Sequence, residues 1–429
     1  MLEPSFIQNN RGAVIAGLHK KHFASAEFVV DEVIDLYQRR NNTKTELNDI
    51  EFKLNAAITQ LGFFFKKQGN SDPTTLDKRD NLRAKVADLK AEAKPINDTL
   101  RQLEAELQAV LVTIPNLPHS SVPAGRTADD NEIVLEHGTI PTLHDEARPP
   151  WALIKKYEII DFELGVKIAG AGFPVYKGKG ARIQRAMINF FLDEALKAGY
   201  TEVQPPILVN EESGFGTGQL PDKEGQMYFA TDDKLYLIPT AEVPITNMYR
   251  DVILPENQLP IKNVGYTPCF RREAGSWGAH VRGLNRLHQF DKVEIVRIEK
   301  EENSYAALEE MSLYVQSLLQ KLELPYRVLR LCGGDMSFTS ALTYDMEVWS
   351  AAQKRWLEVS SVSNFENYQA YRLKLRTKIE GKKGKLHTLN GSALALPRIL
   401  ASILENNQTP DGIRIPAVLV PYCGFDTID

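Results

Sequence analysis

Apolar residues recur at helical spacing through most of the first quarter of the chain. Between residues 82 and 110 they alternate at intervals of four and three without a break: Leu82, Val86, Leu89, Ala93, Ile96, Leu100, Leu103, Leu107 and Val110. A shorter series of the same kind runs from Leu47 to Leu61. This heptad spacing predicts two helices that pack along one seam. Residues 62–75, which contain glycine and proline, separate them, so we expect an antiparallel helical hairpin on the order of 50 Å long.

Three positions depart from this helical pattern. Arg40 and Lys44 fall where the first helix needs apolar residues, and Pro95 is expected to kink or interrupt the second helix. Basic residues gather near the expected turn and would favour a phosphate backbone there: Lys66, Lys67, Lys78, Arg79, Arg83 and Lys85. A solvated tip or a coiled-coil dimerisation element fits this segment, taken alone, equally well.

The pattern changes after residue 112. Prolines are frequent between residues 113 and 150, which predicts an irregular linker, and from Trp151 onwards helices and strands are mixed. We expect helices over 180–198 and 301–322, and strands over 201–209, 344–349 and 356–363. A strand over 234–246 would carry Thr240 and Glu242 on one face. Residues 386–406 predict a strand, a turn at the small residues 391–393, and a helix with Arg398 about two turns along it.

Residues 267–298 predict a β-hairpin that gathers several chemical groups. Its first strand delivers Arg271 and Glu273 at its end. Its second strand places four side chains on one face, because side chains alternate with period two: His288, Phe290, Lys292 and Glu294. Arginine can donate two parallel hydrogen bonds to a phosphate, an aromatic ring can cover an adenine, and a carboxylate can hold an ammonium or a hydroxyl. An isolated Arg-Arg-Glu would more often belong to an ordinary hairpin with a solvated loop.

Composition restricts the class of protein. The 429 residues allow two or three domains, and 43% hydrophobic with 25% charged residues is typical of a soluble globular protein. No membrane-spanning run and no signal peptide are visible, so we expect a cytoplasmic protein with no membrane contact. Three widely spaced cysteines predict a reduced compartment and no structural zinc. The net charge of −5 restricts any RNA contact to local basic patches.

The hairpin resembles the second signature motif of the class II aminoacyl-tRNA synthetases. The order F-R-x-E-x-G-S, a loop and R-x-H-Q-F-x-K-V-E is most similar to the seryl-tRNA synthetases. Residues 180–209 resemble the first motif, which forms much of the dimer interface in that family. Thr240-Ala241-Glu242 is similar to the family's T-A-E signature, and residues 386–406 resemble the third motif.

The resemblance implies an α+β fold, with an antiparallel sheet of six or seven strands flanked by helices and preceded by a helical hairpin arm. It implies a tRNA-binding arm at 1–112, a linker at 113–150 and a catalytic domain at 151–429. The implied reaction is ATP-dependent activation of L-serine to seryl-adenylate, followed by transfer to the 3′ end of tRNA(Ser). The sequence leaves open whether tRNA(Sec) is a second acceptor. A homodimer is also implied.

The resemblance also assigns roles to residues. The serine site comprises Thr240, Ala241, Glu242, Arg271, Glu294, Asn390 and Ser392. The ATP site comprises Arg271, Arg272, Glu273, Phe290, Glu358, Val359, Ser360, Ser361 and Arg398. Within it Arg271 bridges the α-phosphate and the serine carboxylate, Glu273 holds the adenine amino group, and Phe290 and Arg398 enclose the adenine. Mg²⁺ accompanies ATP on Glu358 and Ser361. The catalytic group is Arg271, Glu358 and Arg398.

The chain departs from the family pattern in two places. The hairpin loop has Trp277, Ala279, His280 and Val281 where the family usually has an acidic residue and a threonine, which puts positioning of the tRNA acceptor end in doubt. Residues 169–173 lack the arginine that usually precedes the phenylalanine. Neither departure involves the residues assigned to activation.

Three alternative functions fit less well. A paralogue that loads a carrier protein would have less use for a long arm. A non-enzymatic coiled-coil protein with a degenerate synthetase domain would not need the catalytic set, which is intact: Arg271, Glu273, Glu294, Glu358 and Arg398. A class II synthetase for threonine, proline or histidine is disfavoured by the T-A-E segment and by the arm.

Overall fold

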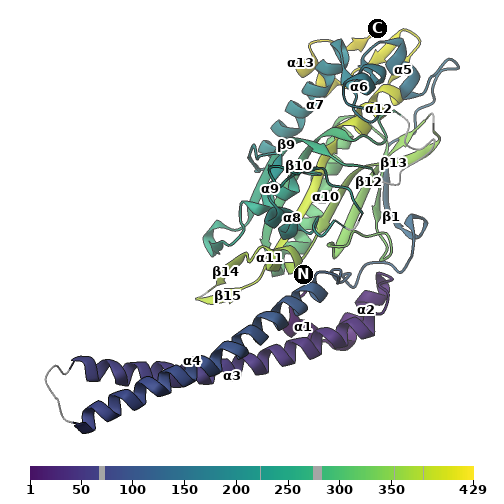
Figure 1. The fold of residues 1–429 in the computed structure, drawn as a ribbon. Helices are drawn as coiled ribbons and strands as arrows, with labels where there is room; N and C mark the ends of the chain where they lie inside the picture. Colours follow the sequence, from purple (N-terminus) through teal and green to yellow (C-terminus); the bar gives the residue numbers. More distant parts are fainter. Residues whose placement is uncertain (67–72, 223, 274–282, 352, 380) are drawn as a thin grey trace. The chain divides into compact units, whose positions relative to one another are not determined.

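The computed structural model describes residues 1–429 except 67–72, 223, 274–282, 352 and 380 (Figure 1). The unusual loop residues Trp277, Ala279, His280 and Val281 therefore lie outside the described residues. The chain forms two compact units. One contains residues 2–19 and 23–115, and the other contains residues 116–429 together with residues 1 and 20–22.

The first unit is the helical hairpin that the heptad pattern predicts. Two short helices, α1 (Pro4–Asn9) and α2 (Arg11–Lys20), precede the long helices α3 (Ala26–Lys66) and α4 (Pro73–Leu111). The two long helices lie side by side (Figure 1). The 41 residues of α3 extend about 60 Å. The first helix ends later than expected, because it continues through the start of the predicted break.

Apolar side chains form the seam between α3 and α4. Ile50, Ala57 and Leu89 are its buried centre. Arg40 occupies an expected apolar position because its guanidinium pairs across the hairpin with Glu104, at 2.9 Å between Nη2 and Oε1. The helix α4 continues through Pro95, so the expected interruption does not divide it.

The second unit is built on an eight-stranded sheet. Its neighbours are antiparallel except for one parallel pair, β4 with β9. In spatial order the strands are β1 (Glu132–His137), β11 (Tyr326–Arg330), β12 (Leu342–Ser350), β13 (Arg355–Asn364), β16 (Leu386–Ala395), β10 (Gln289–Lys300), β9 (Ile261–Phe270) and β4 (Thr201–Glu202). The predicted α+β fold with an antiparallel sheet is confirmed. The segment expected to be an irregular linker adds the edge strand β1.

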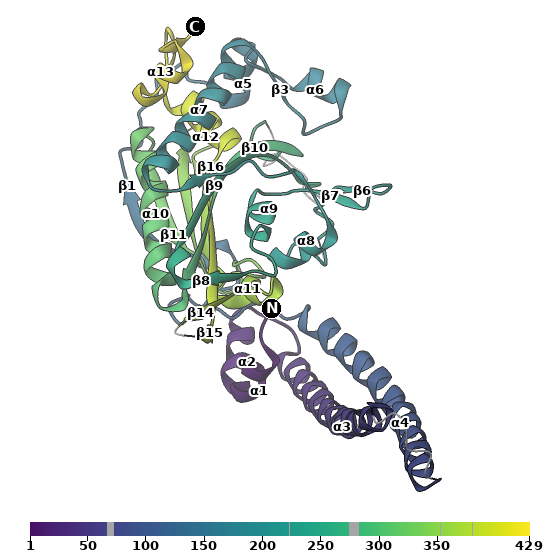
Figure 2. The same cartoon turned by 90° about the vertical axis from the view of Figure 1, so that its left-hand side faces the viewer.

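Helices cover both faces of this sheet, and Figure 2 shows α10 on one side of the strands and α8 and α9 on the other. The first face packs against α7 (Gly178–Lys197), α10 (Ser304–Lys321) and α12 (Leu396–Asn406). The second packs against α9 (Glu242–Asn247) and α11 (Asn367–Arg372). Strand β10 serves both faces, because Val293 and Ile295 join the large core while Val296 packs with Ala241 and Ile245.

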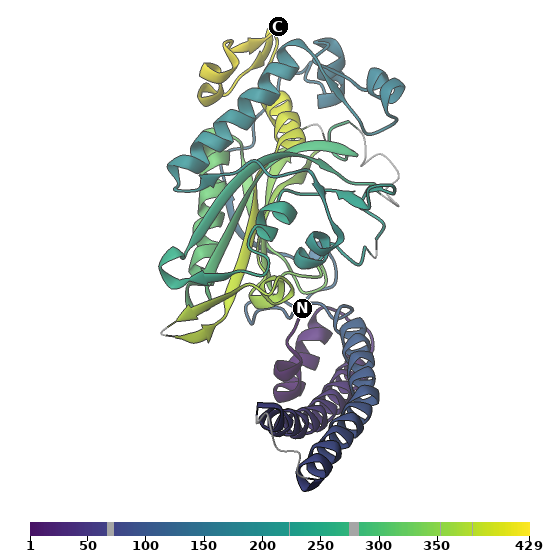
Figure 3. The ribbon, with the colours of Figure 1, turned by 60° about the vertical axis from the view of Figure 1, so that its left-hand side comes forward.

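Shorter elements surround the sheet. They are α5 (Pro150–Lys156), β2 (Ile160–Asp161), α6 (Phe162–Ile168), β3 (Val175–Tyr176), β5 (Leu208–Val209), α8 (Glu211–Thr217), β6 (Phe229–Ala230), β7 (Leu235–Leu237), β8 (Ile253–Pro255), β14 (Arg376–Ile379), β15 (Lys382–Gly384), β17 (Gln408–Thr409), β18 (Gly412–Arg414), α13 (Val420–Cys423) and β19 (Thr427–Ile428). Figure 3 shows the C-terminal elements, in yellow, beside α7.

Three predicted elements were wrong in detail. The strand expected over 201–209 is interrupted at Pro205 and Pro206, since proline removes a ladder donor, and leaves only β4 and β5. The strand expected over 234–246 ends at Leu237. The small residues 391–393 lie inside β16 instead of forming a turn, so Arg398 is in the first turn of α12 and not two turns along it.

Within the described ranges, no helix is long and apolar enough to cross a membrane. The three cysteines, Cys269, Cys332 and Cys423, are buried free thiols.

Candidate active site

Strand β10 lies between β9 and β16, and the register of these strands brings together several residues that are predicted to bind the substrate serine. Glu294 lies opposite Gly265 on one side and Ser392 on the other. Directly opposed residues share a face of the sheet. The Ser392 hydroxyl accordingly points to the Glu294 carboxylate, at 3.4 Å between Oγ and Oε2. Asn390 is two residues further along β16 and is half-buried on the same face.

The T-A-E segment reaches this face as the start of a helix. Ala241 caps α9 and is buried, and the Glu242 backbone N–H lies 3.3 Å from the Thr240 hydroxyl oxygen. Glu242 accepts a hydrogen bond of 2.6 Å from the Gln369 amide of α11. Burial of this side chain raises the pKa of Glu242 to about 7. The hydrogen bond from Gln369 lowers the pKa, but by less than burial raises it.

Lys292 joins the two groups and was missed as a site residue by the sequence analysis. Its Nζ lies 2.6 Å from Glu294 Oε2 and donates to Thr240 Oγ1 at 2.8 Å. Lys292 and Glu294 are both buried. The alternation along β10 had placed Lys292 on the face of Phe290 and Glu294, which was the signal available. Its contact with Thr240 depends on α9, whose position the pattern does not reveal.

Arg271 directly follows β9 and lies beside the serine pocket. Its backbone N–H donates to the His288 carbonyl at 3.0 Å, which holds the chain against the start of β10. The guanidinium carbon lies 5.2 Å from the centre of the Phe290 ring. Arg272 covers the ring of Tyr228 in the same way, at 5.8 Å. Both arginines therefore approach aromatic faces, to which cations are attracted.

Glu273 ends the described part of this strand. Its carboxylate accepts a 2.9 Å contact from Nη1 of Arg286, and its backbone adopts a left-handed φ of 49°. A residue other than glycine bears a cost in that conformation. This conformation directs the Glu273 carboxylate towards Arg286, which lies in the bend three residues before β10 begins.

Strand β13 carries both residues predicted to hold Mg²⁺, Glu358 and Ser361, and pairs with β12. The register shifts near Val359, so that Glu358 lies opposite Glu347 while Ser361 lies opposite Asp345. One extra residue in β13 returns Glu358 and Ser361, three positions apart, to one face. Val359 is buried in the core, and the Ser360 hydroxyl donates to the Ser392 carbonyl at 2.6 Å.

Arg398 of α12 contacts Glu358. Its Nη1 lies 2.6 Å from the Glu358 carbonyl oxygen and 3.4 Å from the carboxylate, and its Nε donates to the Asn285 carbonyl at 3.3 Å. The side chains of Arg398 and Glu358 are 29% and 48% exposed. Both side chains are more exposed than those of Lys292 and Glu294, which are buried.

The oxygen donors on this face fit a magnesium ion. Glu358 contributes a carboxylate and Ser361 a hydroxyl, and Oδ1 of Asp345 is buried without a hydrogen-bond partner in the described structure. Burial, then the negative charge of Glu358, raise the pKa of Asp345 well above its usual value. Across the residues the structure describes, no three His, Cys, Asp or Glu side chains are grouped to hold a metal. A Mg²⁺ ion that binds through one or two carboxylates and substrate phosphates does not need such a group.

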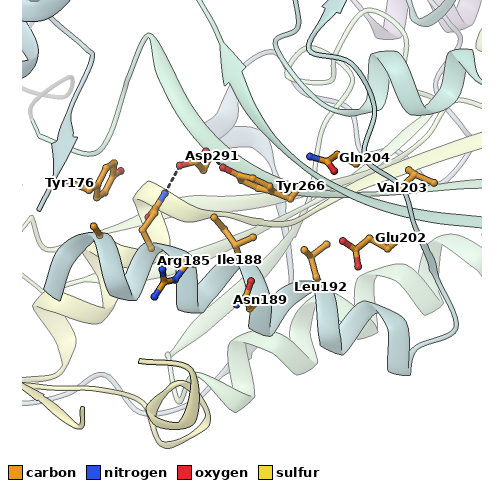
Figure 4. Close-up of a pocket in the computed structure, with 12 residues that line it drawn as sticks. Tyr176, Arg185, Ile188, Asn189, Leu192, Glu202, Val203, Gln204, Tyr266 and Asp291 are labelled. Atoms are coloured by element: carbon orange, nitrogen blue, oxygen red, sulfur yellow. Dashed lines mark hydrogen bonds between the residues drawn. The ribbon is translucent and has the colours of Figure 1, made fainter. Parts of the chain in front are cut away.

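A cavity of about 500 Å³ lies elsewhere, between α7 and the strands β4, β9 and β10 (Figure 4). Asp291 accepts hydrogen bonds from Tyr266 at 2.8 Å and from Gln184 at 2.9 Å. The Tyr176 hydroxyl is buried without a partner in the described structure. None of the predicted site residues lines this cavity, so it is distinct from the serine pocket.

Comparisons with known proteins give consistent matches over the whole chain. The model of the seryl-tRNA synthetase N-terminal domain matches residues 1–118, and that of the class II tRNA synthetase core domain (G, H, P, S and T) matches residues 228–407. The serine–tRNA ligase of Salinibacter ruber is 47% identical over 431 residues, covering 100% of this chain and 99% of the relative. That of Prosthecochloris aestuarii is 44% identical, with the same coverage.

A solved structure shows the same architecture. The seryl-tRNA synthetase from Pyrococcus horikoshii, complexed with ATP, superposes with a TM-score of 0.89 at 31% identity and covers 100% of this chain and 99% of its own. The cytoplasmic serine–tRNA ligase from Naegleria fowleri, in complex with AMP, gives a TM-score of 0.85 at 26% identity. The chain therefore belongs to the seryl-tRNA synthetases, the class II ligases that activate serine with ATP and attach it to tRNA.

Proposed function

We propose that activation occurs where the buried serine pocket meets the ATP side of the same sheet face. The serine pocket is defined here as Thr240, Glu242, Lys292, Glu294 and Ser392. The observation that carries the proposal is the chain of contacts that links Thr240, Lys292, Glu294 and Ser392. Arg271 and Phe290 lie beside it on the same hairpin.

In the first step a serine carboxylate oxygen attacks the α-phosphorus of ATP. The new O–P bond gives seryl-adenylate, and the bond to the β-phosphate breaks to release pyrophosphate. The two reacting groups are both negative and repel each other. Arg271 can donate to both, because its planar fork presents several N–H groups. The protein thus contributes positioning and charge neutralisation instead of a covalent intermediate.

The pocket explains selection of serine by its polar groups. Glu242 receives the substrate ammonium, and Glu294, Asn390 and Ser392 surround its hydroxyl. Alanine has no hydroxyl, so the buried Glu294 carboxylate would lose the hydrogen bond that it accepts from the substrate. A site built for a hydroxyl therefore rejects alanine by roughly four orders of magnitude. Threonine is excluded by its extra methyl group, since the pocket residues Lys292 and Glu294 are buried and Ala241, between Thr240 and Glu242, packs in a buried cluster.

The ATP side uses accessible groups. Phe290 and Arg398 enclose the adenine ring, and Glu273 accepts from its amino group. In the structure Glu273 pairs with Arg286 and Arg398 with Glu358, so these contacts rearrange when the nucleotide binds. Arg272, Val359 and Ser360 support this side, the latter two through core packing and the hydrogen bond to the Ser392 carbonyl.

Mg²⁺ accompanies ATP in this proposal. Glu358 and Ser361 would hold it, with Asp345 beside them. The ion supplies charge neutralisation for the phosphates. The extra residue in β13 places Glu358 and Ser361 on one face, where both would hold the same ion.

In the second step the terminal ribose hydroxyl of tRNA attacks the acyl carbon of the adenylate, and AMP leaves. The helical arm contributes to tRNA binding. Its long helices present many charged side chains, including Lys78 and Lys85 near the tip. Such an arm recognises shape and backbone more than base edges. The limits of the arm at 1–112, the linker at 113–150 and the catalytic domain at 151–429 stay a prediction.

The enzyme is proposed to be a homodimer in the cytoplasm. The cavity beside α7 combines apolar side chains with the Asp291 network, and the buried Tyr176 hydroxyl beside it has no partner among the described residues. A second copy seated on α7 would cover this cavity and its apolar lining. Three free cysteines support a reducing compartment.

Serine-dependent exchange of pyrophosphate into ATP tests the activation step directly, because it needs no tRNA. Exchange with serine, followed by charging of tRNA(Ser) and tRNA(Sec) in parallel, would establish the acceptors. A folded dimeric protein that shows no exchange with any amino acid would overturn the proposal.

A further inference from the structure

We infer that Lys292 is a positioning residue that fixes which groups of the serine pocket donate and which accept hydrogen bonds, and so sets discrimination between serine and alanine. This inference rests on the proposed function. Lys292 is 6% exposed and lies on β10, two residues from Glu294. Its ammonium contacts Glu294 Oε2 at 2.6 Å and Thr240 Oγ1 at 2.8 Å.

The first consequence concerns Thr240. A lysine ammonium has donors only, so Thr240 Oγ1 must accept from Lys292. The same oxygen faces the Glu242 backbone N–H at 3.3 Å. A hydroxyl oxygen has two lone pairs and one hydrogen. Both lone pairs are therefore directed at donors, and the Thr240 hydroxyl is left to donate its hydrogen to the substrate.

The second consequence concerns Glu294. Its Oε2 receives Lys292 and, at 3.4 Å, the Ser392 hydroxyl. The ammonium compensates the charge of this buried carboxylate at close range. A charged carboxylate accepts and cannot donate. Its other oxygen can then accept from the hydroxyl of serine, which alanine lacks.

A purely structural role explains the pair poorly. Apolar residues of similar volume often replace a buried ion pair without loss of stability. Other charged or titratable groups also act on the pair, and Lys292 lies among them: Glu242 from α9, Arg271 after β9 and Cys269 on β9. The carboxylates of Glu242 and Glu294 lie close together, and Lys292 places a positive charge next to Glu294, where the hydroxyl of serine is recognised.

The test compares four variants with the wild type in pyrophosphate exchange with serine and with alanine. Lys292→Met removes the ammonium and keeps the stem. Lys292→Met with Glu294→Gln removes both charges of the ion pair and so leaves neither partner unpaired, in case the single variant does not fold. Thr240→Val removes the whole hydroxyl, both the hydrogen donated to the substrate and the oxygen that accepts from Lys292, and keeps the ammonium of Lys292. Lys300→Met is the matched control, because Lys300 lies on the same strand and pairs with Glu256 at 2.5 Å outside the pocket.

We expect kcat/KM for serine to fall about 100-fold in Lys292→Met while KM for ATP stays within about threefold. The ratio of kcat/KM for serine to that for alanine should fall at least about tenfold, and it should stay low in the neutral double variant even when its Tm matches the wild type. Thr240→Val should lose about tenfold for serine. Lys300→Met should leave both the serine-to-alanine ratio of kcat/KM and the KM for ATP unchanged.

A serine-to-alanine ratio within about threefold of the wild type, in Lys292→Met or in the folded double variant, would overturn the inference. A merely structural role would lower Tm and activity for all amino acids and would leave this ratio unchanged. If the wild type itself lacks serine-dependent exchange, the proposed function fails instead, so the two failures are distinguishable.

Discussion

The proposed serine pocket and the proposed ATP side of the site are neighbours on one sheet, yet their side chains differ in exposure and in bonding. Lys292 and Glu294 are 6% and 1% exposed and already bonded to pocket partners, whereas Arg398 and Glu358 are partly exposed and paired with each other. The difference follows the task. A pocket that separates amino acids differing by one hydroxyl needs polar groups that are buried and fixed. A nucleotide with three phosphates offers many contacts, so its groups can rearrange on binding.

The largest expected effect comes from breaking the buried half. Glu294→Ala removes the acceptor for the substrate hydroxyl and leaves the Lys292 ammonium without its carboxylate. We expect kcat/KM for serine to fall about 1,000-fold or more, because a buried charge without its partner is strongly unfavourable. KM for ATP should stay within about threefold. Pyrophosphate exchange and ATP titration measure both, and comparable serine turnover in this variant would refute the role of Glu294.

Removing the arm tests whether both halves of the site work without it. A variant that lacks residues 30–108, closed by a short glycine–serine linker, keeps every residue of the proposed site. Adenylate formation should stay within about threefold, while charging of tRNA(Ser) should fall about 100-fold or more, since the arm's contacts to the tRNA backbone are lost. Gel filtration and thermal melting serve as controls for folding. Normal charging by this variant would exclude the arm from tRNA binding.

The exposed half should respond through its metal. Glu358→Gln removes one charged oxygen ligand but leaves Ser361 in place. The Mg²⁺ concentration that gives half-maximal exchange should rise about tenfold, and KM for serine should change by less than about twofold. Glu347→Gln is the matched control, because Glu347 lies opposite Glu358 but pairs with Arg327. A change in serine KM that matches the change in Mg²⁺ dependence would dissolve the distinction between the two halves.

The smallest effect is a pH dependence within the buried half. Burial raises the pKa of Glu242 to about 7, so the carboxyl is neutral below that pH and charged above it. The serine ammonium prefers the charged form, and serine should bind more tightly as pH rises through 7. KM for serine should fall about tenfold from pH 6 to pH 8. In Glu242→Gln the profile should be flat, and a parallel fall there would assign the titration to another group.

Alternation and motif order predicted much of this site from the sequence. The period of two along residues 287–298 placed Phe290, Lys292 and Glu294 on one face, and the heptads located both arm helices. These signals are local, since each depends only on spacing along one element. The α+β fold, the family and the serine–tRNA ligase activity followed from the resemblance and are confirmed.

The features that the sequence could not provide depend on partners distant along the chain. Thr240 and Glu242 flank the start of a helix instead of lying along a strand, and only the structure shows that Lys292 reaches Thr240. The bulge that aligns Glu358 with Ser361 leaves no mark in the spacing of apolar residues. Small residues 391–393 suggested a turn, although in the structure they let β16 pass close to its neighbours. The assignments of individual site residues stay predictions.

The most direct test of the account is the ratio of kcat/KM for serine to that for alanine in tRNA-independent pyrophosphate exchange by the wild-type enzyme. If buried groups of the pocket hydrogen-bond the substrate hydroxyl, this serine-to-alanine ratio should be about 10,000 or more. A ratio below about 100 is what packing contacts alone would give, and it would contradict the claim that fixed polar groups of the pocket select serine.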